Sequence, residues 1–234
     1  MLFFGPRGVG KTECARSLGL AFGGSGRSFV SIDMSEYTER HSVSRLIGAP
    51  PGYTGSGEGG VLTEAVRRTP FSVVLFDGVE KAHPDVKSLI SRILDTGCLT
   101  DSDGLTVSFE NATVILTASA DGVSSRAGFY GGTDKGNASA LLGSEITDRV
   151  DDIIYFQPLD AASLRRIALD CANRISRSAR DAGTEIFLPD TAIASAVESC
   201  GGSARALCRT VTRLAQEEMW KKQREKVREY QKST

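Results

Sequence analysis

Short apolar runs recur along the first two thirds of the chain, and most are followed by a turn and by apolar residues at helical spacing. Such runs predict buried parallel strands, which we expect at residues 1–5, 29–32, 73–76, 113–116 and 153–156. Helices are expected at residues 11–22, 35–46, 61–68 and 84–94, with a glycine-rich loop at 48–60 and irregular structure at 120–144. This alternation predicts an α/β fold with a parallel sheet, right-handed crossovers and helices on both faces.

The pattern becomes mostly helical after Pro158. Apolar residues follow helical spacing over 160–182, a short strand is expected at Glu185–Leu188, and two more helices are expected at Asp190–Cys200 and from Ala204 onward. Residues 221–232 are highly charged, which is typical of a solvated helix end. We therefore expect two units, an α/β unit over residues 1–157 and a small helical unit over residues 158–234.

A glycine-rich stretch joins the first expected strand to the first expected helix. It matches G-x-x-x-x-G-K-T and consists of Gly5, Pro6, Arg7, Gly8, Val9, Gly10, Lys11 and Thr12. Backbone N–H groups in such a loop surround phosphate oxygens, and the helix N-terminus adds positive potential. Lys11 is expected to neutralise the β- and γ-phosphates, and Thr12 to offer its hydroxyl to Mg²⁺. The alternative is an ordinary glycine-rich turn, but the strand before it and the helix after it favour a phosphate-binding loop.

The expected strand at 73–76 runs directly into Asp77, which is followed by Gly78. A carboxylate at the end of a buried strand is the usual second group beside the Mg²⁺ of a nucleotide hydrolase. The alternative role of Asp77 is to cap the next turn. In such hydrolases a second acidic residue commonly follows the first and orients the attacking water. Since glycine occupies that position, the sequence raises the question of whether a nucleotide is hydrolysed or only bound.

Composition narrows the function classes. Of 234 residues, 40% are apolar and 24% are charged, and the net charge of −1 does not favour a nucleic-acid partner. No apolar run has membrane-spanning length and no signal peptide is visible, so neither a membrane partner nor secretion is expected. The five cysteines are scattered without a C-x-x-C pair, which favours free thiols in a reducing compartment, either the cytoplasm or an organelle matrix.

Several longer strings carry a family resemblance. Besides residues 4–12, they are IDMSEY at 32–37, SRLIGAPPGY at 44–53, LTEAVRR at 62–68 and EKAHPDV at 80–86. Together they closely resemble the second ATPase module of the Clp family, which comprises ClpB-type disaggregases and ClpA/ClpC-type unfoldases. The resemblance is dense over residues 2–119 and continues in order to about residue 210.

This resemblance implies an AAA+ module with an α/β subdomain and a small helical lid. Such modules form hexameric rings that bind ATP or ADP with Mg²⁺ at subunit interfaces. Gly52, Tyr53, Thr54 and Gly55 resemble the pore loop, whose tyrosine grips an extended polypeptide. An exposed tyrosine between glycines suits that role, although a tyrosine that anchors its own loop is the alternative.

Two arginines acquire roles only through the resemblance. Arg149 resembles the arginine finger that reaches the γ-phosphate of a neighbouring subunit, and a local salt bridge with Asp148 or Asp151 is its alternative. Arg205 resembles the sensor-2 arginine at the start of a lid helix. The segment Ala127-Gly128-Phe129 lies where ClpA/ClpC-type unfoldases carry a loop that docks onto a ring peptidase.

Two departures from the family pattern concern one catalytic step, the positioning of the attacking water. Gly78 replaces the glutamate that polarises water, and Ala120 replaces the asparagine that senses the γ-phosphate and places the same water. Glu80 is not expected to substitute for this glutamate: a strand continued past Asp77 would turn it away from the site, and it belongs to the family pattern in its own right. Residues 56–57 are Ser-Gly where the family usually has a bulky residue and an acid. The given sequence begins at the P-loop strand, without the upstream segment that lines the adenine pocket in the family. Either it is a fragment of a longer chain or its base-binding side is built differently, and weak Mg-ATP binding is expected.

Two function classes follow. The first is an ATP-binding, hydrolysis-impaired module of a Clp-type ring, with homo- or hetero-hexameric partners, polypeptide passing through the pore and a Clp-type peptidase as a candidate partner. The second is an active ATP-driven unfoldase or disaggregase subunit. Gly78 and Ala120 favour the first class for this site, while the family favours the second for the assembly. A P-loop kinase or small GTPase is a remoter class, which the pore-loop and lid strings disfavour.

Overall fold

A computed structural model describes residues 1–23, 29–50, 52, 59–120 and 134–232. By their contacts, the residues form two compact units. The first comprises Met1–Pro6 and Gly10–Phe156, and the second comprises Arg7–Val9 and Gln157–Thr234. Among the helices of the described residues, none combines the length and the apolar character needed to cross a membrane.

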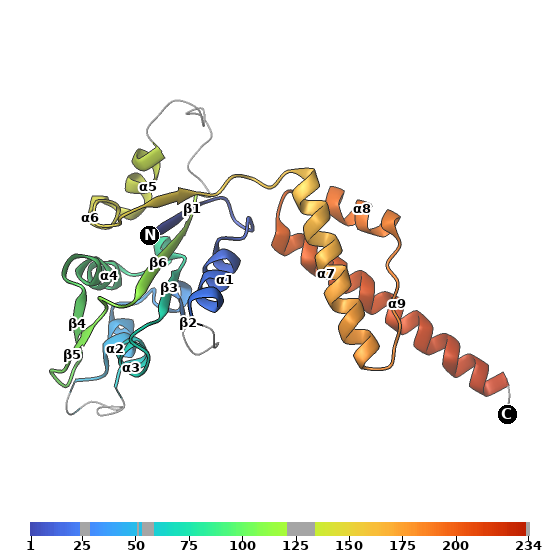
Figure 1. Ribbon diagram of the computed structural model, residues 1–234, viewed down its shortest axis with the longest axis horizontal. Coiled ribbons are helices and arrows are strands. Elements are labelled where there is room, and N and C mark those ends of the chain that lie inside the picture. Colours follow the sequence, from blue (N-terminus) through green and yellow to red (C-terminus); the bar gives the residue numbers. More distant parts are fainter. Residues whose placement is uncertain (24–28, 51, 53–58, 121–133, 233–234) are drawn as a thin grey trace. The chain divides into compact units, whose positions relative to one another are not determined.

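The first unit is built on a parallel sheet (Figure 1). Its strands are β1 (Leu2–Gly5), β2 (Phe29–Asp33), β3 (Val73–Asp77), β6 (Thr113–Ser119) and β7 (Ile153–Tyr155). They lie in the order β2-β3-β6-β1-β7, and every neighbouring pair is parallel. The predicted α/β class and the five predicted strands are therefore confirmed, and the carboxyl ends of β3, β6 and β1 lie side by side.

Alternation along the strands divides the core between the two faces of the sheet. On one face, α1 (Lys11–Gly23) covers a small apolar cluster formed by Phe3, Ala15, Val73, Leu75 and Ile115. The larger cluster on the other face includes Leu2, Phe4, Val74, Phe76 and Leu116. The helices on that face include α3 (Val61–Arg68) and α4 (Pro84–Thr96). Figure 1 shows α1 and α4 on opposite sides of the sheet, as the sequence predicts.

The prediction of one helix over residues 35–46 is wrong. The segment consists of two 3₁₀ turns, η2 (Met34–Glu36) and η3 (Arg40–Ser42), and the short helix α2 (Val43–Ile47). The Asp33 side chain accepts a hydrogen bond from the Ser35 N–H and caps η2. The Tyr37 carbonyl accepts from the N–H of His83, at 2.9 Å, rather than from a later residue of the same helix. A tertiary contact therefore replaces the helical pattern.

The structure also adds elements where none were expected. α5 (Asp134–Leu142) lies within 120–144, which was expected to be irregular, and α6 (Ser144–Thr147) begins at the last residue of that range. Ala138 and Leu142, four positions apart, pack into the larger cluster and account for α5. A hairpin of β4 (Cys98–Thr100) and β5 (Thr106–Ser108) was missed, because strands of three residues give almost no alternation signal.

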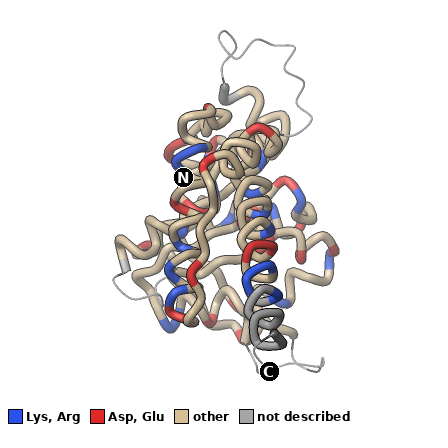
Figure 2. Tube along the Cα trace, turned by 90° about the vertical axis from the view of Figure 1, so that its right-hand side faces the viewer, with Lys and Arg blue, Asp and Glu red and all other residues tan. Residues whose placement is uncertain are grey.

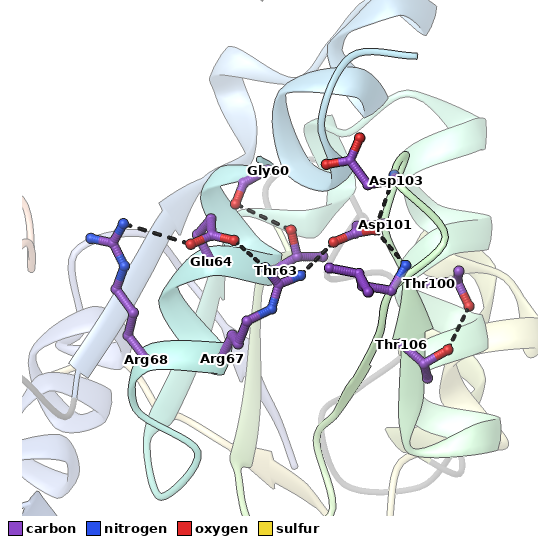
Figure 3. A network of polar contacts seen from close by, with 10 residues as sticks. Gly60, Thr63, Glu64, Arg67, Arg68, Thr100, Asp101, Asp103 and Thr106 are labelled. Atoms are coloured by element: carbon purple, nitrogen blue, oxygen red, sulfur yellow. Dashed lines mark hydrogen bonds and ion pairs between the residues drawn. The ribbon is translucent and has the colours of Figure 1, made fainter. Parts of the chain in front are cut away.

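A network of polar contacts fastens this hairpin to α3 (Figure 3). The carboxylate of Asp101 accepts hydrogen bonds from the backbone N–H groups of Asp103, at 3.0 Å, and Leu105, at 2.8 Å. It is also paired with the guanidinium of Arg67, which in turn bonds Glu64. The Asp101 side chain is only 2% exposed. One buried carboxylate thus closes the hairpin turn and joins it to the helix.

We expect the substitution Asp101→Asn to destabilise the first unit at neutral pH. Burial by itself raises the pKa of Asp101, but the N–H groups and Arg67 outweigh burial and hold that pKa below its usual value. A depressed pKa in the folded state stabilises the fold at pH values above the unfolded pKa of about 3.9. That contribution is lost as the pH falls through the folded pKa.

Denaturant unfolding measured against pH checks this expectation. Loss of the charge-assisted bonds should cost about 1–3 kcal/mol at pH 7, and the difference from the parent should shrink towards acidic pH. Asp103→Asn is a matched control, because Asp103 bonds the Asp101 carboxylate through its backbone N–H, which asparagine keeps. An equal loss in the control, or a difference that does not depend on pH, would contradict the role of Asp101.

The second unit is helical, with α7 (Ala161–Asp181), α8 (Asp190–Ser199) and α9 (Ala204–Lys232) around a core of its own. The prediction of a strand at Glu185–Leu188 is wrong. Two carbonyls of this segment accept hydrogen bonds from side chains: Ser176 donates to the carbonyl of Ile186, and Lys222 donates to the carbonyl of Glu185. Figure 2 shows basic and acidic residues mixed along the described trace, including the helix that leads to the C-terminus.

Candidate functional site

The glycine-rich loop begins at the end of β1 and ends at the first turn of α1. The ammonium of Lys11 donates hydrogen bonds to the carbonyl oxygens of Gly5, at 2.8 Å, and Pro6, at 2.6 Å. Lys11 is only 7% exposed, so its charge is held inside the loop by backbone dipoles. Gly10 has a φ of 103°, which favours glycine. The loop thus holds a buried positive charge at the first turn of α1.

Thr12 and Asp77 meet at the edge of the sheet. The Thr12 hydroxyl lies 3.0 Å from Oδ1 of Asp77 and 3.1 Å from Oδ2. The first turn of α1 supplies Thr12, and the carboxyl end of β3 supplies Asp77. The fold thus brings together two residues that are 65 positions apart in sequence. A site that binds phosphate together with a metal ion would require this proximity.

Thr117, on β6, is a site residue that the sequence reasoning missed. Its hydroxyl donates a hydrogen bond to Oδ1 of Asp77 and accepts one, at 2.8 Å, from the N–H of Gly78. The side chain is buried, with the residue 1% exposed. The one signal in the sequence is its place between the apolar residues Leu116 and Ala118, since a hydroxyl buried there requires a polar partner.

Gly78 begins a sharp turn directly after β3. Its φ of 78° and ψ of 50° lie in the left-handed region, which costs other L-residues about 1–2 kcal/mol. Its N–H is bonded to the carbonyl of Thr117, at 3.2 Å, as well as to the hydroxyl. A Cβ at this position would lie 3.5 Å from the ammonium of Lys81. Position 78 therefore lacks a side chain and also has a backbone conformation that favours glycine.

The expectation that Glu80 points away from the site assumed that the strand continues past Asp77, and the structure contradicts that assumption. The strand ends at Asp77, and Glu80 lies in the 3₁₀ turn η4 (Val79–Lys81). Both of its carboxylate oxygens are buried and make no hydrogen bond to any residue that the structure describes. Glu80 is the nearest carboxylate along the chain after the missing acid, so it becomes a residue to test.

Ala120 follows β6 and lies beside the loop. Its N–H donates to the carbonyl of Gly5, at 3.2 Å, and this carbonyl also accepts from Lys11. The side chain at this position is a methyl group, which cannot bind a water molecule by a hydrogen bond. The structure thus brings the two departures, at 78 and 120, to the same sheet edge as Lys11 and Thr12.

The other predicted site residues lie elsewhere or outside the described part. Arg149 donates to the Glu145 carbonyl, at 2.6 Å, and forms an ion pair with Asp95 on α4, at 3.4 Å. Arg205 is exposed in the first turn of α9, within the second unit. Arg7, Gly8 and Val9 also belong to the second unit by their contacts. Gly52 is exposed with a φ of 91°, whereas residues 53–55 and 127–129 lie outside the described residues.

The donor atoms at the sheet edge suit Mg²⁺ when it is bound together with phosphate. Mg²⁺ prefers hard oxygen ligands and is usually held by one or two protein groups together with substrate phosphates and water. Thr12 and Asp77 supply a hydroxyl and a carboxylate within hydrogen-bonding distance of each other. Among the described residues, no group of three or more His, Cys, Asp or Glu side chains is arranged to hold a metal ion alone.

The chain resembles known proteins over most of its length. Residues 1–153 match the family model described as AAA domain (Cdc48 subfamily). The chaperone protein ClpB of Helicobacter hepaticus is 46% identical over 195 residues, which cover 82% of this chain and 23% of that protein. A probable ClpB 1 of Chlorobaculum tepidum is 46% identical over 206 residues, covering 82% of this chain and 47% of that protein.

A relative with a different description matches equally far. The ATP-dependent Clp protease ATP-binding subunit ClpC of Staphylococcus aureus (strain USA300) is 42% identical over 206 residues, which cover 82% of this chain and 25% of that protein. The chain thus spans less than half the length of these relatives. The parallel sheet, the loop at its edge and these matches agree with the resemblance read from the sequence. The chain belongs to the AAA domain family (Cdc48 subfamily) and is a Clp-type AAA+ protein.

Proposed function

We propose that the chain is a nucleotide-binding AAA+ module of a Clp-type protein unfoldase or disaggregase, and that its own site binds Mg-ATP or Mg-ADP but hydrolyses ATP slowly. The central observation is the contact of Thr12 with Asp77 beside the buried ammonium of Lys11. The groups that would handle phosphate and metal are together, while positions 78 and 120 offer no group that could position water.

Each residue has a defined task in this proposal. Lys11 exchanges its bonds to the loop carbonyls for bonds to phosphate oxygens, which are stronger because both partners are charged. Thr12 and Asp77 hold Mg²⁺, which would screen the charge that accumulates on the phosphates. The N–H groups of the loop, from Gly5 to Thr12, surround the phosphates at the start of α1. None of these tasks requires a general base.

We further propose that the module works in a ring. The small helical unit, residues 158–234, would act as the lid over the nucleotide, with Arg205 contributing as sensor 2. Arg149 would leave its pair with Asp95 to reach the nucleotide of a neighbouring copy or related subunit. Tyr53, with Gly52, Thr54 and Gly55, would contact the polypeptide that passes through the ring.

An active ATP-driven motor is the alternative function. The ClpB relatives are described as chaperones and the ClpC relative as the ATP-binding subunit of an ATP-dependent protease. The buried, unpartnered carboxylate of Glu80 also favours this alternative, because it is the one acid near the turn without a hydrogen bond among the described residues. Binding of a slowly hydrolysed ATP analogue and steady-state phosphate release, measured on the same assembled sample, distinguish the two functions. Binding without turnover supports the proposal.

A peptidase contact is the most specific partner proposal, and it rests on Ala127-Gly128-Phe129. A phenylalanine in a glycine-rich segment could fill an apolar pocket on a partner. Because Ala127 is smaller than the usual residue of the docking loop, we expect a weak association. Co-purification with a Clp-type ring peptidase should be lost in Phe129→Ala and kept in Phe187→Ala, a substitution of an exposed phenylalanine in the second unit. Association that survives Phe129→Ala would remove the proposed contact.

A further inference from the structure

Thr117 connects two parts of the candidate site that the sequence suggested separately. It lies on the central strand β6, between the buried residues Leu116 and Ala118. Its one hydroxyl accepts a hydrogen bond from the N–H of Gly78 and donates its proton to Oδ1 of Asp77. The single proton of this hydroxyl and one of its two lone pairs are therefore directed at the end of β3, where the metal is proposed to bind.

The hydrogen-bond geometry determines how Asp77 is presented to Thr12. Oδ1 of Asp77 lies within hydrogen-bonding distance of both threonine hydroxyls, whereas Oδ2 lies 3.1 Å from the hydroxyl of Thr12. A carboxylate held at one oxygen by a buried group cannot rotate freely about its last bond. Its second oxygen stays directed at the first turn of α1, where phosphate and metal would arrive.

The same hydroxyl stabilises the turn at Gly78. The N–H of Gly78 is bonded both to the hydroxyl and to the carbonyl of Thr117. This pairing holds a left-handed backbone directly beside the carboxylate. The turn at the position of the missing acid is therefore fixed by the residue that orients Asp77.

We propose that Thr117 is a positioning residue for the metal–phosphate site: it orients the Asp77 carboxylate toward Thr12 and fixes the adjoining turn before Mg-nucleotide binds. This inference rests on the proposed nucleotide site and deepens it, because it assigns Mg²⁺ dependence to a residue outside the loop and outside the Asp77-Gly78 pair. Removing a group that hydrogen-bonds to a metal ligand and so orients it typically lowers metal affinity about 10–100-fold.

A merely structural role for Thr117 predicts a different pattern of variants. Thr117→Val keeps the shape of the side chain and removes the hydroxyl, whereas Thr117→Ser keeps the hydroxyl and removes a methyl group. If Thr117 only fills the core, serine should be the more harmful change. If it positions Asp77, valine should be the more harmful change and serine should restore the parental behaviour.

The test measures the affinity of a fluorescent ATP analogue for the whole chain in EDTA and across a Mg²⁺ titration. We expect Thr117→Val to raise about 10–100-fold the Mg²⁺ concentration at which the increase in affinity for the ATP analogue is half complete. The affinity for the analogue in EDTA should stay within about twofold of the parent. Thr117→Ser should titrate like the parent. An unchanged Mg²⁺ titration in Thr117→Val, or a loss in the serine variant as large as in the valine variant, would overturn the inference.

A second measurement works without nucleotide and separates this inference from the proposed function. Hydrogen exchange of the Gly78 amide, followed by NMR, should be about tenfold faster in Thr117→Val than in the parent and close to parental in Thr117→Ser. If the parent chain itself binds no Mg-nucleotide, the proposed function fails, and the amide alone decides whether Thr117 fixes the turn. Equal exchange in all three chains would overturn it. Thr117→Cys, a variant of similar volume with a weak donor, replaces valine if that variant does not fold.

Discussion

Replacing Lys11 with alanine or methionine should weaken Mg-ATP binding by about 10–100-fold, which corresponds to the loss of bonds between a charged donor and a charged acceptor. The Lys11 ammonium bonds the loop carbonyls of Gly5 and Pro6 and the residue is 7% exposed, so either substitution removes the positive charge held inside the loop. Methionine is the sharper variant because it keeps most of the length of the side chain and removes only the charge.

Calorimetry with a slowly hydrolysed ATP analogue measures this loss. The Lys11 variants also remove two hydrogen bonds within the loop, so their unfolding temperature has to be compared with that of the parent before the affinity is interpreted. Lys221→Ala, on the exposed face of α9 where Lys221 pairs with Glu218, is a control that should bind like the parent. Equal affinity in a folded Lys11→Met chain would mean that the loop does not bind phosphate through this residue.

The sheet and the loop could be predicted because they follow from local signals. Buried parallel strands appear as unbroken apolar runs, as at Val73–Phe76, and the spacing of Gly10, Lys11 and Thr12 after a strand is specific. The prediction of a helix at 35–46 failed because the carbonyl of Tyr37 accepts its hydrogen bond from the N–H of His83, a residue far along the chain. A pattern confined to one segment contains no information about such a partner.

The candidate site could be predicted only in part, for a related reason. The sequence identified Gly78 as a missing side chain, but it could not show that the backbone there is left-handed. Thr117 was missed because its role depends on the pairing of β3 with β6, which places its hydroxyl beside Asp77. A threonine in a strand is common, since β-branched residues fit a pleated sheet, so its type alone gave no reason to select it.

Steady-state ATP hydrolysis by the assembled chain should be slower than in an active Clp-type motor by at least about 10²–10⁴-fold, the usual cost of losing a positioned general base. Hydrolysis requires stabilisation of charge on the phosphate and in-line placement of water. In the proposed ring, Lys11, Mg²⁺ held by Thr12 and Asp77, and Arg149 of a neighbour would provide the first. Gly78 and Ala120, the two positions at the sheet edge where water would be placed, provide no polar side chain for the second.

Restoring one group should not restore the rate. A glutamate at position 78 must adopt a φ near 78° at a cost of about 1–2 kcal/mol, or the turn must move and give up its bonds to Thr117. Its Cβ would also lie near the ammonium of Lys81, which can pair with the new carboxylate. Gly78→Glu should therefore recover little, and Gly78→Glu with Ala120→Asn should recover more, because groups that act on one step are not additive.

Phosphate release by the parent chain, under conditions where a ring is shown to form, decides between the two functions. Turnover on the order of one per second or faster, a typical enzymatic rate, would contradict an impaired site and require another residue that positions water. Glu80 is then the residue to replace, since its buried carboxylate has no hydrogen-bond partner among the described residues. If Glu80→Gln removed that turnover while Mg-ATP binding remained, the acid in the turn after β3 would serve as the base, and the absence of a side chain at Gly78 would mark a displaced catalytic group rather than a lost one.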